Sequence, residues 1–175
     1  MEFEYKLKIP KDRIAVLIGK KGKVKKEIQK ETKTKIIIDS KEGEVTIQGD
    51  DALGLYTARE VIRAIGRGFN PEISMLLLKG DYIFDLIDIS DYAKTKKALI
   101  RLKGRIIGEG GKSRRHIETL TRTHIAVYGK TVGIIGNAED VMIARKAIIA
   151  LLEGSKHATV YRMIERKRRE AKYLI

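Results

Sequence analysis

The stretch Ile18-Gly19-Lys20-Lys21-Gly22-Lys23 recurs as Ile107-Gly108-Glu109-Gly110-Gly111-Lys112 in a chain of 175 residues, and this pair of stretches decides the fold. In each copy two glycines, three positions apart, separate an apolar segment from a polar segment that favours helix. Glycine has no Cβ, so it tolerates positive φ and lets another molecule approach the backbone closely. A helix that begins just after such a loop presents unpaired N–H groups and the positive end of its dipole. Both stretches therefore predict phosphate-binding loops.

The two halves of the chain repeat one pattern around these loops. Matching residues keep a constant separation as far as the strand that follows each loop: Gly19 and Gly108, Ile28 and Ile117, Thr32 and Thr121, Thr34 and Thr123, and Ile36 and Ile125. Further along, the separation shrinks by two residues and then by one, and only between predicted elements. Chance would not confine the gaps to such places, so the sequence predicts a duplicated fold.

Each half is predicted to follow the order strand, helix, helix, strand, strand, helix. In the first half, alternating and helical spacings predict these elements over residues 3–9, 12–18, 23–32, 35–39, 44–48 and 51–66. In the second half we expect a strand over 82–89 and then a helix that Ser90 or Asp91 caps and that runs to Ile107. A short apolar helix is predicted over 73–79.

These elements divide the chain into domains at its glycine-rich breaks. The predicted parts are a first domain over 1–68, a linker with a short helix over 69–80, a second domain over 81–154 and a basic C-terminal helix over 155–175. The outer face of that last helix carries many Lys and Arg side chains. Such a charge run is compatible with a solvated surface or with a contact to RNA.

The charge balance favours a polyanionic partner. There are 37 Lys and Arg against 23 Asp and Glu, so the formal net charge is +14, and the isoelectric point is near 9.9. Nucleic acid is the first candidate for such a basic protein, and an anionic membrane surface is a weak second. Abundant Lys, Arg and Glu with few Asn and Gln also resemble the composition of a thermophile's protein.

Several classes of protein are disfavoured by composition. The chain has no cysteine, which excludes disulfides, thiolate catalysis and cysteine-ligated zinc. None of the three histidines has a partner at a metal-binding spacing. No apolar run approaches the roughly 20 residues of a membrane span, and the acidic N-terminus has no signal-peptide pattern. We therefore expect a cytoplasmic protein without a metal or other cofactor.

Two motifs that suggest enzymes fail on inspection. Gly111-Lys112-Ser113 lacks the further glycine of an ATP-binding loop, because Ile106 stands in its place. Asp85 and Asp88 differ by three positions on a predicted strand, so they face opposite ways and do not form a metal-binding pair. No combination of nucleophile, base and oxyanion donors can be assembled, and we expect no catalytic residues.

Two Gly-x-x-Gly loops, each between two helices and followed by two strands at matched spacing, resemble the loops of KH domains. The resemblance implies an α+β fold of two tandem type I KH domains, each with a three-stranded antiparallel sheet packed on helices. In KH domains the loop binds the backbone of about four nucleotides of single-stranded RNA, and the bases lie in an adjacent groove. By this resemblance the RNA-binding residues are Ile18, Gly19, Lys20, Lys21, Gly22, Lys23, Val24 and Ile37, and Arg105, Ile107, Gly108, Glu109, Gly110, Gly111, Lys112, Ser113, Arg114, Arg115, His124, Ile125 and Ala126.

Within these loops, the backbone amides at Gly22-Lys23 and Gly111-Lys112 are expected to hold phosphates. The two loops differ in their middle residues, since Lys20-Lys21 adds positive charge whereas Glu109-Gly110 adds flexibility and one negative charge. The helices that follow depart from the usual KH pattern, because Lys25 and Arg114 stand where an apolar residue is common. The turn between the last two strands also shrinks, to Gly129-Lys130, in the second half.

The paired domains and the segment from Ile117 to Ile125 resemble one subfamily in particular, the ribosome-assembly KH proteins of the Pno/Dim type (partner of Nob) in their archaeal form. The resemblance implies a monomeric, noncatalytic factor that binds the 3′ region of small-subunit ribosomal RNA during ribosome assembly and pre-rRNA processing. A Nob-type endonuclease or a translation initiation factor is an implied partner. An adaptor that docks proteins is the alternative, and the sequence leaves open whether the first domain binds RNA, protein or both.

Overall fold

The computed structural model describes residues 3–173, which fall into two compact units that divide between Tyr82 and Ile83. Residues 1–2 and 174–175, at the outer ends of the predicted first domain and C-terminal helix, lie outside the described residues. Each unit has the order strand, helix, helix, strand, strand, helix. This order confirms the duplicated α+β fold.

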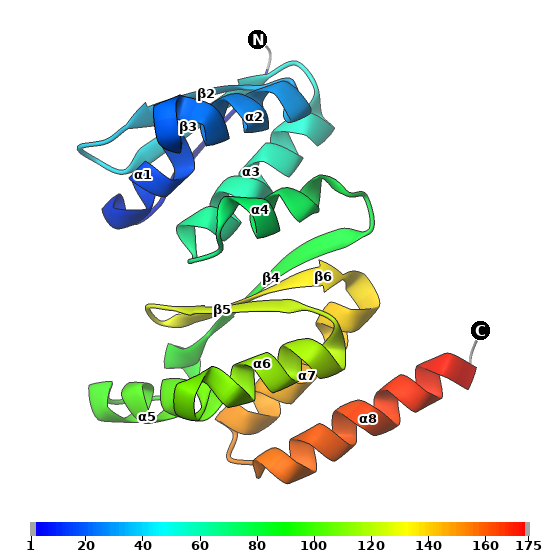
Figure 1. The fold of residues 1–175 in the computed structure, drawn as a ribbon. Coiled ribbons are helices and arrows are strands. Elements are labelled where there is room, and N and C mark those ends of the chain that lie inside the picture. The colour runs from blue at the N-terminus through cyan, green and yellow to red at the C-terminus, as the bar shows by residue number, and fades with distance from the viewer. Residues whose placement is uncertain (1–2, 174–175) are drawn as a thin grey trace. The chain divides into compact units, whose positions relative to one another are not determined.

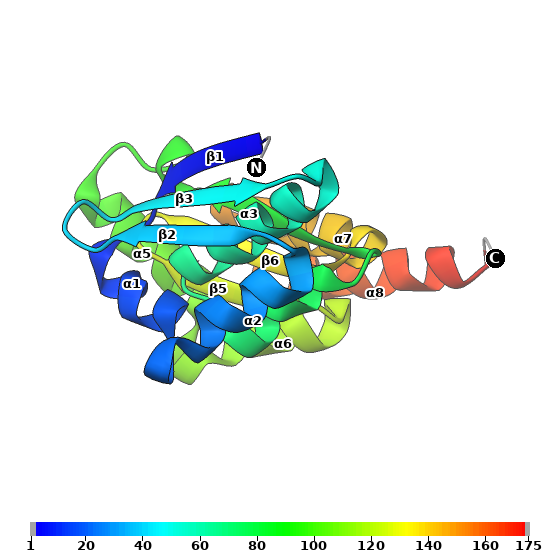
Figure 2. The same ribbon diagram turned by 90° about the horizontal axis from the view of Figure 1, so that it is seen from above.

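In the first unit, one sheet carries its helices on a single face. The elements are β1 (Phe3–Lys8), α1 (Lys11–Ile18), α2 (Lys23–Thr32), β2 (Lys35–Asp39), β3 (Glu44–Gly49) and α3 (Ala52–Gly66). β3 lies between β1 and β2, with antiparallel pairing on both sides (Figure 2). Strand alternation buries Val45 and Ile47 of β3 completely and leaves Ile37 of β2 exposed on the face away from the helices.

The second unit repeats this arrangement with a further long helix. Its elements are β4 (Tyr82–Asp88), α5 (Lys96–Ile107), α6 (Lys112–Thr121), β5 (His124–Tyr128), β6 (Thr131–Asn137), α7 (Ala138–Leu152) and α8 (His157–Tyr173). The sheet order is β4-β6-β5, and the helices again lie on one face (Figure 1). α8 confirms the predicted C-terminal helix as far as the described residues reach.

The core of the second unit draws on every element of the repeat. Ile106 of α5, Ile117 of α6, Ile134 of β6 and Ile148 of α7 are all completely buried in one cluster. Burial of such a side chain contributes about 2 kcal/mol to stability. The periodic apolar residues of the repeat are therefore the residues that hold helices and sheet together.

A helical segment follows the last helix of each repeat and packs on its second and last helices. In the first unit this segment is α4 (Pro71–Ser74) with a 3₁₀ turn over Met75–Leu78, and in the second unit it is α8. A glycine with positive φ turns the chain at each start, Gly68 at 102° and Gly154 at 104°. The two repeats therefore share their exit turn as well as their core.

Two helix boundaries differ from the sequence prediction. The helix before the second loop begins at Lys96 and is capped by Thr95, whose hydroxyl oxygen accepts a hydrogen bond of 3.0 Å from Ala98 N–H, so the predicted caps Ser90 and Asp91 are wrong. Residues Ile89–Asp91 form a 3₁₀ turn instead. The predicted helix over 73–79 starts earlier, because Asn70 caps α4 ahead of Pro71, and it continues only as a 3₁₀ turn.

Candidate nucleic-acid interface

The two glycine loops have the same backbone conformation. Gly19 has φ 74° and ψ 174°, and Gly108 has φ 74° and ψ 171°. A positive φ with an extended ψ is a conformation that essentially only glycine adopts. The second glycines, Gly22 and Gly111, are left-handed with φ of 73° and 79°. One loop geometry therefore ends the first helix and begins the second in both units.

The first glycine of each loop also makes room for the helix that follows. A Cβ on Gly19 would lie 2.5 Å from Val24 Cγ2, and a Cβ on Gly108 would lie 2.7 Å from Ser113 Cβ. Neither distance can accommodate a side chain, whereas a Cβ on Gly22 would meet only the flexible end of Lys26, at 3.8 Å. The first glycine is required by space and by φ, and the second glycine by φ.

The middle of each loop contains a further left-handed residue. Lys21 has φ 57° and ψ 27°, and Gly110 has φ 61° and ψ 19°. A non-glycine residue in this conformation costs roughly 1–2 kcal/mol, so the first loop retains a lysine there at the expense of stability. Gly110, which we expected to add flexibility, fits a fixed left-handed position.

The loop amides that can meet a phosphate are not those predicted. Gly22 N–H donates to Gly19 C=O at 3.1 Å, and Gly111 N–H donates to Gly108 C=O at 3.1 Å. The N–H groups of Lys23 and Lys112 are also used inside the loop. Within the two loops, both of which the structure describes in full, the N–H groups without an acceptor are those of the middle residues, namely Lys20, Lys21, Glu109 and Gly110. The prediction that Gly22-Lys23 and Gly111-Lys112 offer open amides was wrong.

A groove lies beside the loop of the first unit, between α1, α2 and the edge strand β2. Its volume is about 320 Å³, and its lining residues are Ile18, Gly22, Lys25, Lys26, Gln29, Ile38 and Ser40. Ile38 rather than Ile37 reaches it, because adjacent strand residues face opposite ways. In the second unit Ala126 is the counterpart of Ile37. By the same alternation, Ala126 and His124 lie on the sheet face opposite to that of Ile125.

The free edge of β2 supplies backbone groups to this groove. Ile36 N–H points away from β3 and donates to Gln29 Oε1 of α2 at 2.8 Å. Because hydrogen-bonding direction alternates along an antiparallel strand, the N–H and C=O of Ile38 point to the same open edge. The groove therefore offers one donor and one acceptor of the backbone beside the Lys25 side chain.

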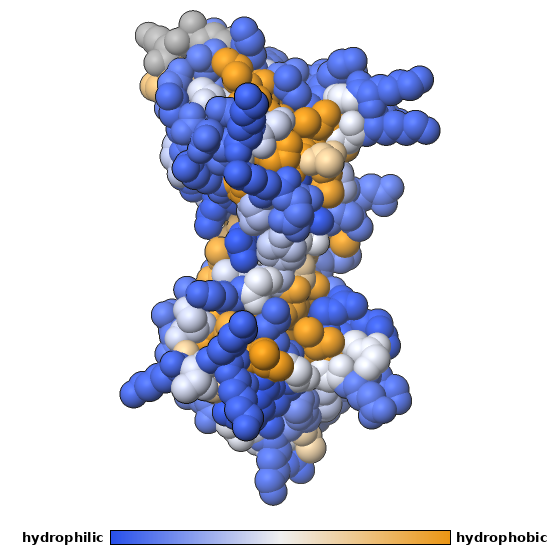
Figure 3. All heavy atoms as spheres, turned by 90° about the vertical axis from the view of Figure 1, so that its left-hand side faces the viewer, coloured by the Kyte–Doolittle hydropathy of each residue, from blue (hydrophilic) through white to orange (hydrophobic). Residues whose placement is uncertain are grey.

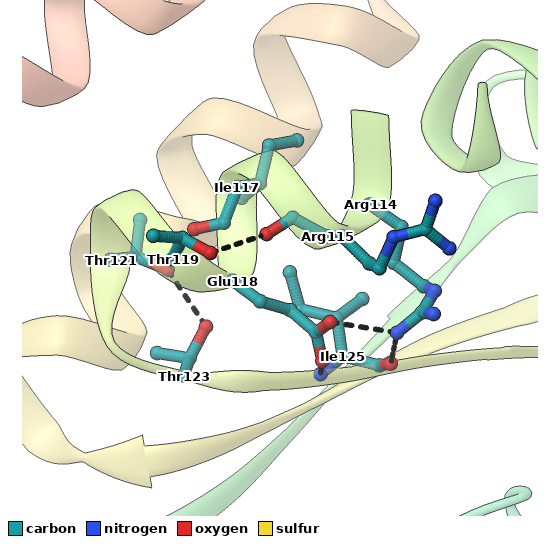
Figure 4. Close-up of polar contacts among 8 residues, drawn as sticks. All are labelled: Arg114, Arg115, Ile117, Glu118, Thr119, Thr121, Thr123 and Ile125. Carbon is teal, nitrogen blue, oxygen red and sulfur yellow. Dashed lines mark hydrogen bonds and ion pairs between the residues drawn. The ribbon is translucent and has the colours of Figure 1, made fainter. Parts of the chain in front are cut away.

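In the second unit the corresponding position holds an ion pair (Figure 4). Glu118 accepts the Ile125 N–H at 2.8 Å and pairs with Arg114 at 2.7 Å, and Arg114 also reaches Ile125 C=O at 3.5 Å. Arg114 and Glu118 are 30% and 20% exposed, so the pair stands at the surface of the groove. The surface beside Arg114, Glu118 and the edge of β5 is the counterpart of the first groove in the repeat, and we call it the second groove. The two units share this backbone arrangement and differ in charge at this one place.

Below the groove, a pair of buried threonines fixes the turn from helix to strand. Thr121 donates to Ile117 C=O at 2.6 Å and lies 2.8 Å from the Thr123 hydroxyl (Figure 4). Thr32 and Thr34 make the same contacts at the same distances in the first unit. These hydroxyls satisfy one another inside the protein, so the turn from helix to strand is the same in both units.

The predicted site residues have different surroundings. The flanking cations Lys20, Lys21, Lys23, Lys112 and Arg115 are exposed around the loops, together with Glu109. Ile125 is core, with 4% of its surface exposed. Arg105 donates to the carbonyl of Leu151, at the end of α7, and to that of Ser155, in the turn before α8, as Arg13 does to Ile65 and Phe69 in the first unit. The structure thus places Arg105 in a structural contact.

Sequence reasoning missed the side chains that tether the second helix to the strand edge, Gln29 and Glu118. They hold the same position in the repeat, and each accepts an N–H of the strand at 2.8 Å. Their equal spacing from the loop glycines was the available signal. A polar residue on a predicted helix surface does not by itself suggest a backbone partner.

Other classes of site find no support in the described part of the chain. No group of three His, Asp or Glu side chains within residues 3–173 could hold a metal ion. Asp85, one of the carboxylates considered above, pairs with Arg145 at 2.8 Å. Among the described helices, none is long and apolar enough to cross a membrane.

Comparison with known proteins shows similarity to KH-domain proteins. The model of the KH domain matches residues 4–64, and the model described as eukaryotic type KH-domain (KH-domain type I) matches residues 83–169. A KH domain-containing protein of Methanocaldococcus jannaschii is 52% identical over 170 residues, which are 95% of this chain and 74% of that protein. The RNA-binding protein PNO1 of Oryzias latipes is 34% identical over 63% of this chain, which spans only 46% of that protein.

A solved structure is similar over nearly the whole chain. It is the a/eIF2alpha-aDim2p-rRNA complex from Pyrococcus horikoshii, with 49% identity and a TM-score of 0.90, and the match covers 96% of this chain and 95% of the other. The match therefore includes both units of this chain.

The loop geometry predicts opposite effects for two glycine substitutions four residues apart. Gly108→Ala places a Cβ 2.7 Å from Ser113 at a φ of 74°, so unfolding free energy should fall by about 3 kcal/mol. Gly104→Ala, on the exposed surface of α5 with nothing within 4 Å of its Cβ, should raise it by about 1 kcal/mol. Denaturant titration checks both, and an Ala at 108 that costs nothing would contradict the packing described.

The helix-to-strand tether predicts an asymmetry between two substitutions of Glu118. Glu118→Gln keeps an oxygen for the Ile125 N–H, as Gln29 does in the first unit, and should change stability by less than about 1 kcal/mol. Glu118→Ala leaves that N–H and Arg114 without their partner, and should cost about 2 kcal/mol. Equal losses in denaturant titrations of the two variants would show that the tether is not the contact that matters.

Proposed function

The chain belongs to the family of tandem KH-domain proteins of the PNO1/Dim2 type, and from this premise we propose that it binds single-stranded RNA through both glycine loops. The observation that supports the proposal most directly is the shared loop conformation, which leaves two N–H groups per loop without an acceptor. Exposed cations flank both pairs of amides. The protein acts as a binding factor and carries out no catalysis.

The loops and grooves have separate tasks in this function. Contacts to phosphate position a nucleic acid, whereas contacts to the base edges specify its sequence. The open amides with Lys20, Lys21, Lys112 and Arg115 hold the backbone, and the strand edge beside Ile38 or the equivalent Val127 meets the bases. Because the phosphate contacts release counterions, affinity falls steeply as salt rises.

The two grooves differ in what they can recognise. Lys25 and Gln29 border the first groove, whereas Arg114 and Glu118 present a planar donor and a carboxylate in the second. A guanidinium binds the O6 and N7 acceptors of guanine in a bidentate manner. The second groove therefore favours a guanine beside Arg114, and the first groove does not.

The RNA partner that we propose is the 3′ region of small-subunit ribosomal RNA, during ribosome assembly and pre-rRNA processing in the cytoplasm. Support comes from the similarity to aDim2p, whose structure contains rRNA and a/eIF2alpha. A translation initiation factor and a Nob-type endonuclease are the proposed protein partners of a monomer. Docking of such a factor is the second function considered, since the first unit could bind protein in place of RNA.

Substitutions that place a negative or a positive charge at Gly110 test the proposal that the second loop binds RNA. Glu109→Asp with Gly110→Asp keeps the carboxylate at 109, adds a second one at 110 beside the open amides, and should lower RNA affinity at least about tenfold. Gly110→Lys copies Lys21 and should raise it. Both changes keep the fold, since Asp tolerates the left-handed conformation and the first loop already carries a lysine there. Fluorescence anisotropy with a 3′ rRNA oligonucleotide and a scrambled control measures the effects.

The same measurement separates RNA binding from protein docking at the first unit. Lys20→Asp with Lys21→Asp should weaken RNA binding if both units contact the strand. If RNA affinity stays at the wild-type value while capture of initiation factor 2α is lost, the first loop docks protein. If the second-loop variants also bind RNA as the wild type does, the RNA-binding proposal fails.

A further inference from the structure

The second repeat contains an insertion that the first repeat folds without. Ile9 and Ile89 occupy equivalent places, since each donates its N–H to a carbonyl of the strand–strand turn, Gly43 at 3.0 Å and Lys130 at 2.7 Å. Gly19 lies ten positions after Ile9, whereas Gly108 lies 19 positions after Ile89. The nine additional residues are therefore not needed to close the fold.

This insertion builds a pocket of its own. A cavity of about 440 Å³ is lined by Ser90, Ala93, Lys94, Thr95, Lys96, Leu99 and Lys130. Three lysines form its rim and no acid lines it, while Ala93 and Leu99 supply an apolar floor. On the side of this unit that carries α5 and the β5–β6 turn, hydrophilic side chains predominate and small apolar areas show between them (Figure 3).

The rim lysines have no ionic partner among the residues that the structure describes. Within residues 3–173, no ion pair joins Lys94, Lys96 or Lys130 to a carboxylate. Thr95 is already used as a helix cap, and the Ser90 hydroxyl donates to Asp88 at 2.6 Å. Three exposed lysines around an apolar floor would repel one another, and an anionic ligand with an apolar part would relieve this repulsion.

The pocket lies at the strand–strand turn of the second unit, and the corresponding turn of the first unit borders the groove. In the first unit Ser40, just after β2, lines the groove, and its counterpart after β5 is Gly129, the neighbour of Lys130 in the same turn. α5 spans the interval from the pocket at its start to the glycine loop at its end. Its 12 residues correspond to about 18 Å. An RNA strand that passes along the groove and over this turn reaches the lysines.

We propose that this lysine-rimmed pocket binds one further nucleotide of the RNA, outside the groove of the second KH domain. Lys94 and Lys96 contact the phosphates on either side of that nucleotide, and its base or ribose covers Ala93 and Leu99. The inference rests on the proposed RNA-binding function. The place of the pocket at this turn favours RNA over an acidic protein segment, because an RNA strand held beside Arg114 and the edge of β5 passes over the same turn.

The test compares RNA length with charge reversal. A short RNA of roughly five nucleotides fills one groove, which holds about four, and an RNA of roughly 12 nucleotides extends beyond it. The variant is Lys94→Glu with Lys96→Glu. Its matched control is Lys146→Glu with Lys156→Glu, which makes the same charge change at exposed positions of the same unit that line neither pocket nor groove. Fluorescence anisotropy over a salt series gives the affinities.

The pocket variant should bind the longer RNA about tenfold more weakly and the short RNA as well as the wild type does. For the longer RNA, the slope of log K against log salt should be shallower by about 1.4 in the pocket variant than in the wild type, because each of two lost phosphate contacts contributes about 0.7. The control variant should leave the difference between the two RNAs unchanged.

Three results would overturn the inference without touching the proposed function. They are an equal loss on both RNAs, an equal loss in the control, or full affinity for the longer RNA. The last of these, together with lost binding of a poly-glutamate peptide, would assign the pocket to an acidic protein. If the wild type binds neither RNA, the proposed function fails and takes the inference with it.

Discussion

The absence of a side chain at Gly19 and Gly108 is the constraint on which both units depend. Each glycine adopts a φ and ψ that other residues avoid, and each lies against the side chain five positions later, Val24 or Ser113. This close approach lets two helices meet at a tight corner and leaves the intervening backbone at the surface. The open amides, the cations around them and the groove follow from that corner.

Polar contacts hold the second helix and the edge strand in the same arrangement in both units, whereas the side chains beside them differ. The buried threonine pairs and the tethers from Gln29 and Glu118 fix the angle between helix and edge strand with the same distances in both units. The backbone is nearly the same in both units, but the second unit has Arg114 where the first unit has Lys25. The two units therefore share the backbone of the loop and of the strand edge and differ in the side chains beside them.

Most of the fold could be predicted from the sequence because each element of the repeat occurs twice, so the pattern of one copy could be checked against the other. Constant spacing from Gly19 and Gly108 located strands, helices and loops correctly. The start of α5 was missed because Ser90, Asp91 and Thr95 are all acceptable caps, and packing rather than propensity chose among them. The open amides were misplaced because a 3₁₀ turn uses the N–H groups of Gly22 and Gly111, and no residue pattern distinguishes that turn from a direct helix start.

Backbone amide resonances offer the most direct test of the central claim that bare loop backbone binds the RNA strand. In a ¹⁵N-labelled sample titrated with single-stranded RNA, the largest shifts should fall on the amides of Lys20, Lys21, Glu109 and Gly110, with smaller shifts along β2 and β5. Saturable RNA binding that leaves these four amides unmoved and shifts only the outer faces of the sheets would contradict the account.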